Sequence, residues 1–446
     1  MIAGRLQSLI RNRQANVAMI FGLCAIPLMF AVGASVDYTS AALHESQMNA
    51  YADAASLAGV RPAILGQNDA ASVTAATNAF NAQAEAYSGV NYNPSTLKVT
   101  VTDTGVRRTV TVTWAASSQN AFAGILGFAT TALGGSAQAV GSLAPNINFY
   151  LLLDSSPSQA IAATPAGITT MVQNTPSQGG CAFGCHESNP QADNLGNPGG
   201  EDNYALARSL GVALRIDNVT AAAQGLMSTA QATEESNQVT YEMAIDTFDV
   251  GVTTIQTLTS NLSLAQQSAA NISLLEVYDQ GCATETNCNN DEDTNYDMAM
   301  NTINSTMPNP GNGTRSAGDT PQEVLFLVTD GVEDEYQLPA LNPTTMTPGR
   351  QQYLMNSNTD WCSTIKNRGI RIAVLYTEYL PLPTNPWYVN FAGSGAGISS
   401  FQSGIGQQLQ NCASPGLYYE VENGGDISAA LNSLFQTAVQ TSYLSQ

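Results

Sequence analysis

Apolar and polar residues follow three different patterns in the first part of this chain. Residues 16–36 form an apolar run without a charge, long enough for a helix to cross a bilayer of about 30 Å. Residues 37–88 are rich in alanine with few breakers before Gly59, which predicts that this helix continues beyond the membrane and that a second helix follows. Residues 95–114 alternate valine with threonine on both sides of Asp-Thr-Gly, which predicts a β-hairpin.

The rest of the chain alternates between strand and helix patterns. NFYLLLD at 148–154 and EVLFLVTDG at 323–331 are continuous apolar runs that end in an acid, as buried parallel strands do. We expect further strands at 371–379 and 417–423, a hairpin at a sheet edge over 241–259, and helices at 202–231, 264–275, 296–307 and 427–444. The alternation predicts an α/β fold, with a doubly wound, mostly parallel sheet that binds ligands at the carboxyl ends of its strands.

The distribution of charge predicts on which side of the membrane each end of the apolar run lies. The chain has 446 residues, enough for two or three domains, with 14 Lys and Arg against 35 Asp and Glu, a net charge of -21. An acidic surface excludes nucleic acid as a partner. Arg5, Arg11 and Arg13 precede the run with no acid among them, which predicts a cytoplasmic N-terminus, a single pass through the inner membrane, and a periplasmic large domain. The cell surface is the other location open to that domain.

Two kinds of processing compete with a retained anchor. A cleaved signal peptide would explain the small residues around Gly33, but the apolar run is longer than the core of such a peptide. Prepilin-type processing needs a Gly-x-x-x-x-Glu motif before the apolar helix, whereas Gly33 and Asp37 follow it. We therefore expect residues 1–36 to be a basic cytoplasmic segment with a transmembrane anchor, residues 37–145 a long helix with a small α+β stalk module, and residues 146–446 the α/β domain.

Cysteine usage fits an oxidising compartment. Cys24 lies in the apolar run, and proximity suggests that the other six form the pairs Cys181–Cys185, Cys282–Cys288 and Cys362–Cys412. The first pair belongs to CAFGCH, in an insertion at about 176–203, which is one residue too long for the Cys-x-x-Cys-His motif that attaches haem. With His44 as the only other histidine, we prefer a disulfide that pins this loop.

A carboxylate and several hydroxyls follow the first strand of the α/β domain. Asp154, Ser156 and Ser158 are spaced so that a turn brings them to one side. This Asp-x-Ser-x-Ser pattern resembles the metal-ion-dependent adhesion site (MIDAS) of von Willebrand factor A domains. The resemblance covers residues 146–443, and it implies a von Willebrand A-like fold, a further ligand from Thr294 in a second loop, and another from Asp330 at the end of a later central strand.

The resemblance implies binding and cell adhesion, not catalysis. The site would hold Mg²⁺, or Mn²⁺ or Ca²⁺, with a coordination position open to a carboxylate of a protein partner. Pro157 and Gln159 depart from the family, which often has glycine and methionine there. The alternative is that these serines and aspartates only cap helices and turns.

Other chemistry has less support. Residues 291–297 resemble a calcium loop, but Tyr296 stands where an EF-hand needs glycine and Thr302 where it needs glutamate. The sequence has no Gly-x-Ser-x-Gly motif, and no general base is expected beside the hydroxyls. We therefore expect that this protein is not a hydrolase or another enzyme. The acidic residues at 332–335 are expected to form an exposed turn.

The N-terminus narrows the family. Arginines before the apolar run, Asn-Val-Ala at its start, Pro27 within it, Asp37 after it and the ADAASLA helix are similar to the N-terminal segment of TadG-like proteins of tight-adherence (Flp) pilus systems. This resemblance implies a pilus-assembly or surface-attachment role, with pilus or pilus-assembly proteins as partners. Two functions stay open: a metal-dependent adhesion or assembly component, and a structural scaffold whose site is non-functional or merely stabilising.

Overall fold

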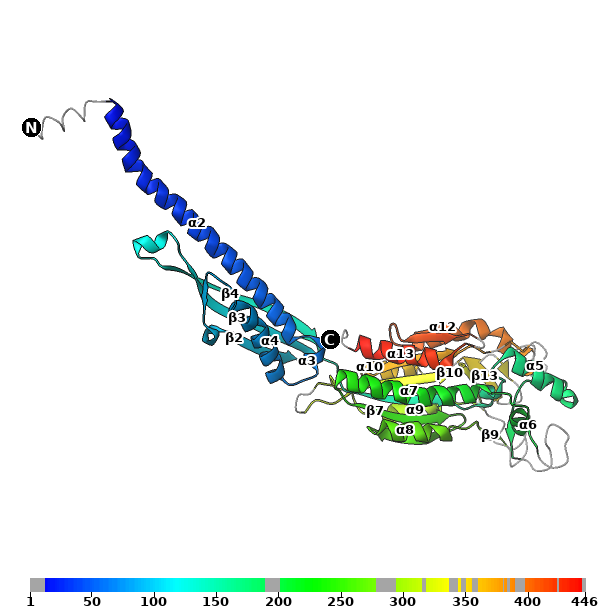
Figure 1. Ribbon diagram of the computed structural model, residues 1–446. Helices are drawn as coiled ribbons and strands as arrows, with labels where there is room; N and C mark the ends of the chain where they lie inside the picture. The colour runs from blue at the N-terminus through cyan, green and yellow to red at the C-terminus, as the bar shows by residue number, and fades with distance from the viewer. Residues whose placement is uncertain are drawn as a thin grey trace, which may run out of the picture. The chain divides into compact units, whose positions relative to one another are not determined.

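The computed structural model divides the chain into two compact units, residues Met1–Leu143 and Ala144–Gln446 (Figure 1). The residues that the structure describes are 13–188, 201–277, 294–314, 318–336, 344–345, 350–354, 360–379, 381–382, 386–389, 398–422 and 425–442.

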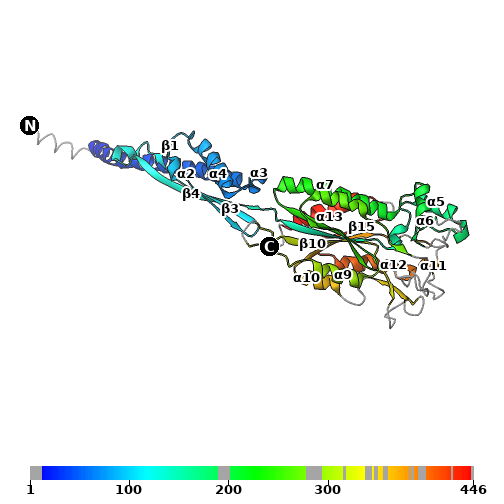
Figure 2. The ribbon, with the colours of Figure 1, turned by 90° about the horizontal axis from the view of Figure 1, so that it is seen from below.

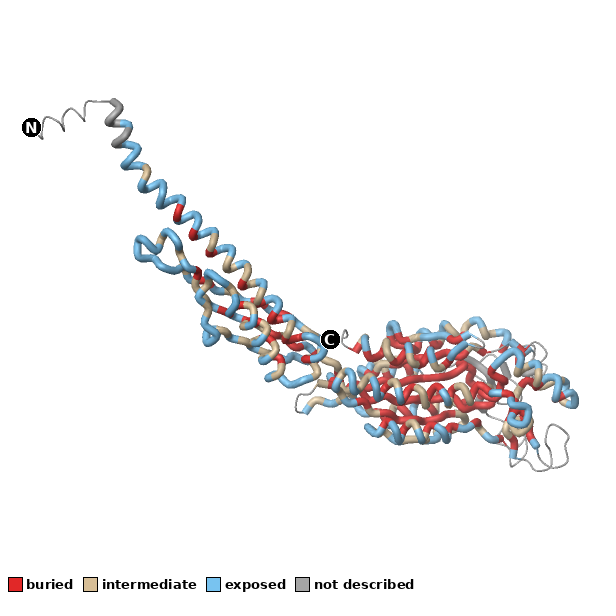
Figure 3. Tube along the Cα trace, in the orientation of Figure 1, coloured by how far each residue is buried: buried red, intermediate tan, exposed pale blue. Residues whose placement is uncertain are grey.

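The first unit is built on one long helix. Helix α2 (Arg13–Gly59) contains the apolar run and continues without a break for 47 residues, as the sequence predicts. Among the described residues it is the one helix long and apolar enough to cross a membrane, and the apolar part is almost wholly exposed (Figure 3). A short helix α3 (Pro62–Leu65) and the predicted second helix, α4 (Asp69–Ala84), follow; Asn68 caps α4 by accepting a hydrogen bond from Ala71 N.

An antiparallel sheet packs against α2 and α4. It consists of β1 (Val90–Tyr92), β2 (Lys98–Thr104), β3 (Arg107–Gln119) and β4 (Thr130–Ser142). The expected hairpin is β2 and β3, with Gly105 at φ 59° in its turn. The sequence pattern did not reveal β4, because its Gly-, Ala- and Ser-rich stretch has low strand propensity; it forms because it pairs with β3 from end to end. Met48, Phe80 and Trp114 fill the core between helices and sheet.

The second unit contains a six-stranded sheet in the order β15-β14-β10-β5-β7-β8. All neighbouring strands are parallel except the edge hairpin β7–β8. Numbered by their sequence within this sheet, the strands run 6-5-4-1-2-3, which is a doubly wound order. The bounds are β5 (Ile147–Asp154), β7 (Tyr241–Phe248), β8 (Val252–Thr259), β10 (Gln322–Thr329), β14 (Arg371–Thr377) and β15 (Tyr418–Val421).

Helices cover both faces of this sheet, which confirms the expected α/β class (Figure 2). One face packs on α7 (Arg215–Asn237), α8 (Leu262–Ser268) and α13 (Ile427–Thr441), the other on α9 (Tyr296–Thr306), α10 (Trp361–Asn367) and α12 (Gln402–Cys412). Successive residues of β5 point to opposite faces, so that Phe149 and Leu151 enter one core and Tyr150 and Leu152 the other. A strand buried on both faces must be apolar throughout, which explains the run that ends at Asp154.

The prediction of one helix at 202–231 is wrong, because this segment forms two helices. Helix α6 (Asn203–Ser209) ends before Gly211, whose φ of 65° leaves the helical region, and α7 starts at Arg215. The insertion between β5 and α7 also contains α5 (Pro165–Asn174) and the short strand β6 (His186–Glu187), which pairs with β9 (Glu276–Val277).

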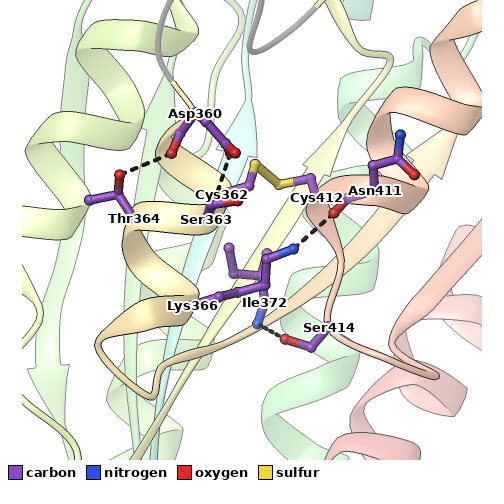
Figure 4. Close-up of a disulfide and its surroundings, with 9 residues drawn as sticks. All are labelled: Asp360, Cys362, Ser363, Thr364, Lys366, Ile372, Asn411, Cys412 and Ser414. Carbon is purple, nitrogen blue, oxygen red and sulfur yellow. Dashed lines mark hydrogen bonds between the residues drawn. A yellow bond between two sulfur atoms is a disulfide. The ribbon is translucent and has the colours of Figure 1, made fainter.

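Of the three expected disulfides, Cys362–Cys412 is present and joins α10 to the end of α12 (Figure 4). A hydrogen bond also joins these two helices: Lys366 Nζ of α10 donates to Asn411 O of α12 at 2.8 Å. The expectation for Cys181–Cys185 is wrong, because the structure forms no disulfide between these two described cysteines and places Cys181 Sγ 3.7 Å from Phe183 O. Cys282 and Cys288 lie outside the described residues.

Glu323 makes the stability of the second unit depend on pH. Its side chain is buried on β10, where Oε1 accepts a hydrogen bond from Asn148 Nδ2 at 2.9 Å and Oε2 has no partner among the described residues. Burial raises the pKa of Glu323 from 4.5 to about 8. The folded state thus favours the protonated acid, and stability falls as the pH rises from the unfolded value toward the folded one.

We expect Glu323→Gln to stabilise the protein at pH 8.5 by about 1–3 kcal/mol relative to the unsubstituted chain, because an uncharged amide is cheaper to bury than a carboxylate. The gain should be almost absent at the unfolded pKa of 4.5. Urea unfolding at pH 4.5 and 8.5 measures both values, and Glu235→Gln, at an exposed position on α7, is the control. An equal effect of Glu323→Gln at both pH values would contradict the assignment.

Candidate metal centre

Four of the five predicted site residues, Asp154, Ser156, Ser158 and Asp330, lie where the strand order of the sheet reverses. Strands β5 and β10 are parallel neighbours, and their carboxyl ends lie side by side. Asp154 is the last residue of β5, and Asp330 comes directly after β10. Connections leave the two strands in opposite directions, which opens a crevice for a ligand at this point of a doubly wound sheet.

Hydroxyl groups surround the carboxylate of Asp154. Ser156 Oγ donates to Asp154 Oδ1 at 2.6 Å and lies 2.9 Å from Ser158 Oγ, while Thr329 Oγ1 donates to Asp154 Oδ2 at 2.7 Å. The turn after β5 therefore brings the three residues of the Asp-x-Ser-x-Ser pattern together. Ser155 points away, since its hydroxyl contacts Phe248 O and Asp249 Oδ2, both at 3.0 Å.

Asp330 is fully buried and has different neighbours. Its Oδ1 accepts from Val332 N at 3.3 Å, and its Oδ2 lies 3.4 Å from Gln159 Nε2. Arg215 Nη1, from the first turn of α7, lies 3.8 Å from Asp330 Oδ2, an ion pair without a hydrogen bond. The other end of the guanidinium, Nη2, donates to Thr377 O at 2.6 Å.

The two carboxylates repel one another in a dry site. Burial, and after it the charge of Asp330, raises the pKa of Asp154 to about 7, against hydrogen bonds from Ser156 and Thr329 that lower it. Burial also raises the pKa of Asp330, and the guanidinium of Arg215 opposes that rise. A cation placed between the carboxylates would relieve both penalties.

The donor set fits a small hard cation. Asp154, Asp330, Ser156 and Ser158 offer only carboxylate and hydroxyl oxygens, which are the ligands of Mg²⁺, Mn²⁺ and Ca²⁺. The described residues contain no group of three or more His, Cys, Asp and Glu side chains arranged for a metal, so any site here depends on the hydroxyls.

The fifth predicted ligand, Thr294, is held by its backbone. It forms an antiparallel bridge with Asp334, with N–H to O distances of 3.0 and 2.9 Å. Two residues later, the hydroxyl of Tyr296 contacts the hydroxyl of Thr329 and accepts from Gly331 N at 3.2 Å. The second loop therefore reaches the site through Tyr296.

The acidic turn expected at 332–335 is wrong. These residues belong to strand β11 (Val332–Tyr336), in which Glu333 and Asp334 are buried. Glu333 Oε1 accepts from Tyr296 N at 3.1 Å, and the backbone of Asp334 bonds to Thr294. The charge is buried because it holds the start of α9 beside β10, a contact that no local pattern reveals.

The sequence analysis did not predict two residues that contact the acids of the site, Arg215 and Thr329. Thr329 stands next to Asp330, and a hydroxyl beside a strand-end aspartate is a signal that could have been used. Arg215 gave none, because an arginine within a helical pattern is normally solvated. The loop after β5 is further braced by the insertion, where Gly184 N donates to Ala160 O at 2.8 Å and Arg215 N to Ile161 O at 3.0 Å.

Residues 15–67 match the model of the family described as "Putative Flp pilus-assembly TadE/G-like". This match confirms the similarity of the N-terminal segment to TadG-like proteins. No curated protein matches the chain.

Solved structures show distant likenesses. A conserved hypothetical protein BatB from Bacteroides thetaiotaomicron is 12% identical, covering 66% of this chain and 98% of its own, with a TM-score of 0.33. The vWF domain of the type V pili tip protein Mfa5 from Porphyromonas gingivalis is 9% identical, covering 67% and 96%, with a TM-score of 0.34. The pilus adhesin SpaC from Lactobacillus rhamnosus GG is 10% identical, covering 78% and 33%, with a TM-score of 0.35.

Proposed function

We propose that this protein is a membrane-anchored component of pilus assembly or adhesion, and that its α/β domain binds a protein partner through a divalent cation. The pilus context comes from the family match at residues 15–67. The apolar part of α2 is a candidate single-pass anchor. We further propose that the N-terminus is cytoplasmic and that the α/β domain acts in the periplasm or at the cell surface.

One observation supports the metal-dependent part of this proposal. Asp154 and Asp330, 176 positions apart along the chain, are brought to adjacent strand ends together with the hydroxyls of Ser156 and Ser158. Burial raises the pKa of both acids, and the charge of Asp330 raises that of Asp154 further. Buried carboxylates of this kind destabilise a fold, so their convergence needs a compensating group. A divalent cation is the proposed group.

Each residue would have a distinct role in binding the cation. Asp154 and Asp330 would supply negative charge, Ser156 and Ser158 would supply neutral oxygens, and Thr294 is the further proposed ligand. A bound Mg²⁺ would keep net positive character and accept a carboxylate of the partner. Thr329 and Gln159 hold the two acids in place through hydrogen bonds at 2.7 and 3.4 Å.

A specific observation favours the second candidate function, a structural scaffold. Arg215 already places one positive charge 3.8 Å from Asp330. A guanidinium in that position compensates part of the buried charge without any metal. In that case the site would stabilise the domain, and pilus proteins would bind to other surfaces.

Calorimetric titration with Mg²⁺ and Mn²⁺ of the full chain in detergent, followed by binding of purified pilus subunits in Mg²⁺ and in EDTA, separates the two. Metal binding together with metal-dependent capture supports the adhesion or assembly function. Capture that EDTA leaves unchanged supports the scaffold.

A further inference from the structure

The hairpin between β3 and β4 carries an exposed apolar tip. Residues 120–129, which we call the hairpin tip, include the turn η2 (Ala123–Leu126) and lie within a stretch from Thr109 to Leu153 without a charged residue. Four large apolar side chains of the tip face solvent: Phe122 is 44% exposed, Ile125 76%, Leu126 56% and Phe128 69%. Such a group on one short loop marks an interaction surface.

The hairpin tip is fixed to the long helix at one level. The carboxylate of Asp37 accepts backbone hydrogen bonds from Ala121 at 2.8 Å, Phe122 at 3.1 Å and Ala123 at 2.6 Å, and only 5% of Asp37 is exposed. These backbone N–H groups, of which that of Ala123 has the largest effect, lower the pKa of Asp37 below its ordinary value. Asp37 is therefore ionised at neutral pH, and its carboxylate accepts these hydrogen bonds there. These hydrogen bonds place the tip beside α2; Figure 1 shows it in cyan at the end of the hairpin formed by β3 and β4.

A second contact, between Gly33 of α2 and Phe122 of the tip, also positions the tip along the helix. A Cβ atom at Gly33 would lie 2.6 Å from Phe122 Cβ, so that only glycine allows the phenylalanine this near the helix. Gly33 lies inside the uncharged run, and Asp37 is the first charged residue after it. At 1.5 Å of rise per residue, Gly33 lies about 6 Å further into the uncharged run than Asp37, so the contacts of Phe122 extend from the level of Asp37 to that of Gly33.

We propose that the hairpin tip inserts into the lipid interface on the side of the membrane where Asp37 lies. The inference rests on the anchoring part of the proposed function. If residues 16–36 span the bilayer, the tip lies at the boundary between acyl chains and headgroups, where apolar side chains are buried from water. Helix α2 also carries exposed apolar side chains in this part of the uncharged run, at Phe30, Val32 and Val36.

Lipid is the occupant that this geometry favours. The level of the tip is set by the end of the apolar run, which a protein partner would not require. A second attachment point beside the helix would fix the tilt of the first unit relative to the bilayer surface, because one helix alone leaves its tilt and rotation undetermined.

The test places a tryptophan on the tip of the full chain in nanodiscs of ordinary or brominated phosphatidylcholine. Phe128→Trp reports the tip. Val140→Trp is the matched control, since Val140 is 49% exposed on the same hairpin and pairs with Thr109, ten residues along β4 from Thr130 and roughly 33 Å away. Emission of the unsubstituted protein is subtracted from both.

We expect Phe128→Trp to emit at shorter wavelength than Val140→Trp and to lose intensity in brominated lipid, while Val140→Trp keeps its intensity. Solvent-like, unquenched emission of Phe128→Trp would overturn the proposal. Short-wavelength emission that brominated lipid does not quench would also overturn it and would indicate burial against a second copy or another protein. Failure of the unsubstituted protein to float with lipid vesicles is a different result, because it would remove the anchor itself.

Discussion

Asp154→Ala is expected to abolish Mg²⁺ binding by this protein. Asp154 is the carboxylate to which two hydroxyls of the site donate, at 2.6 and 2.7 Å, and it faces the second acid, Asp330. Its removal takes away a charged ligand and the anchor of Ser156. We expect a loss of affinity of about 100-fold or more, since removing even supporting partners of metal ligands costs roughly 10–100-fold.

The neighbouring residue provides the control for this experiment. Ser155 has the same burial as Ser156, but its hydroxyl contacts Phe248 and Asp249 on the other side of the strand end. Ser155→Ala should therefore leave the calorimetric affinity for Mg²⁺ within a few-fold of the original. Circular dichroism checks that both variants fold. Equal affinities of Asp154→Ala and the unsubstituted chain would exclude this site as the place where metal binds.

Arg215→Met is expected to raise the affinity for Mg²⁺ and to destabilise the metal-free protein. Two unit charges 3.8 Å apart interact by about 4 kcal/mol at an effective dielectric constant of about 20, and a divalent cation beside Asp330 would be repelled by the same guanidinium. Removing that repulsion should tighten Mg²⁺ binding by about tenfold or more. Without metal, Asp330 loses its buried counter-charge, at a cost of roughly 3 kcal/mol.

Urea unfolding in EDTA and calorimetry with Mg²⁺ measure the two effects separately. Arg208→Met is the matched control, because Arg208 forms an ion pair with Asp217 at 2.6 Å on a partly exposed surface, where such a pair contributes about 1 kcal/mol or less. The result bears on both candidate functions. If the unsubstituted chain binds no Mg²⁺ and Arg215→Met does, the arginine replaces the metal and the scaffold function is favoured. Unchanged stability and affinity would show that Arg215 does not act on the site.

The sequence by itself determined the long helix and the central buried strands of this protein. A short continuous apolar run that ends in an acid indicates a strand buried on both faces, and an uncharged run of about 20 residues indicates a helix long enough to cross a bilayer, so β5, β10 and α2 follow from local pattern. The same reasoning placed Asp154 and Asp330 at strand ends, and parallel pairing then brings them together. These features are readable because periodicity and residue type are local properties.

The tertiary structure alone decided the features that depend on contacts between distant residues. Strand β4 exists because β3 pairs with it, and the acids at 333 and 334 are buried because they join α9 to the end of β10. Arg215 reaches Asp330 only because the insertion ends where α7 meets the sheet, and Asp37 receives the hairpin tip from more than 80 residues away. Hydrogen bonds and ion pairs of this kind leave no periodic pattern in the chain, since each is fixed by the packing of whole elements and not by its neighbours in sequence.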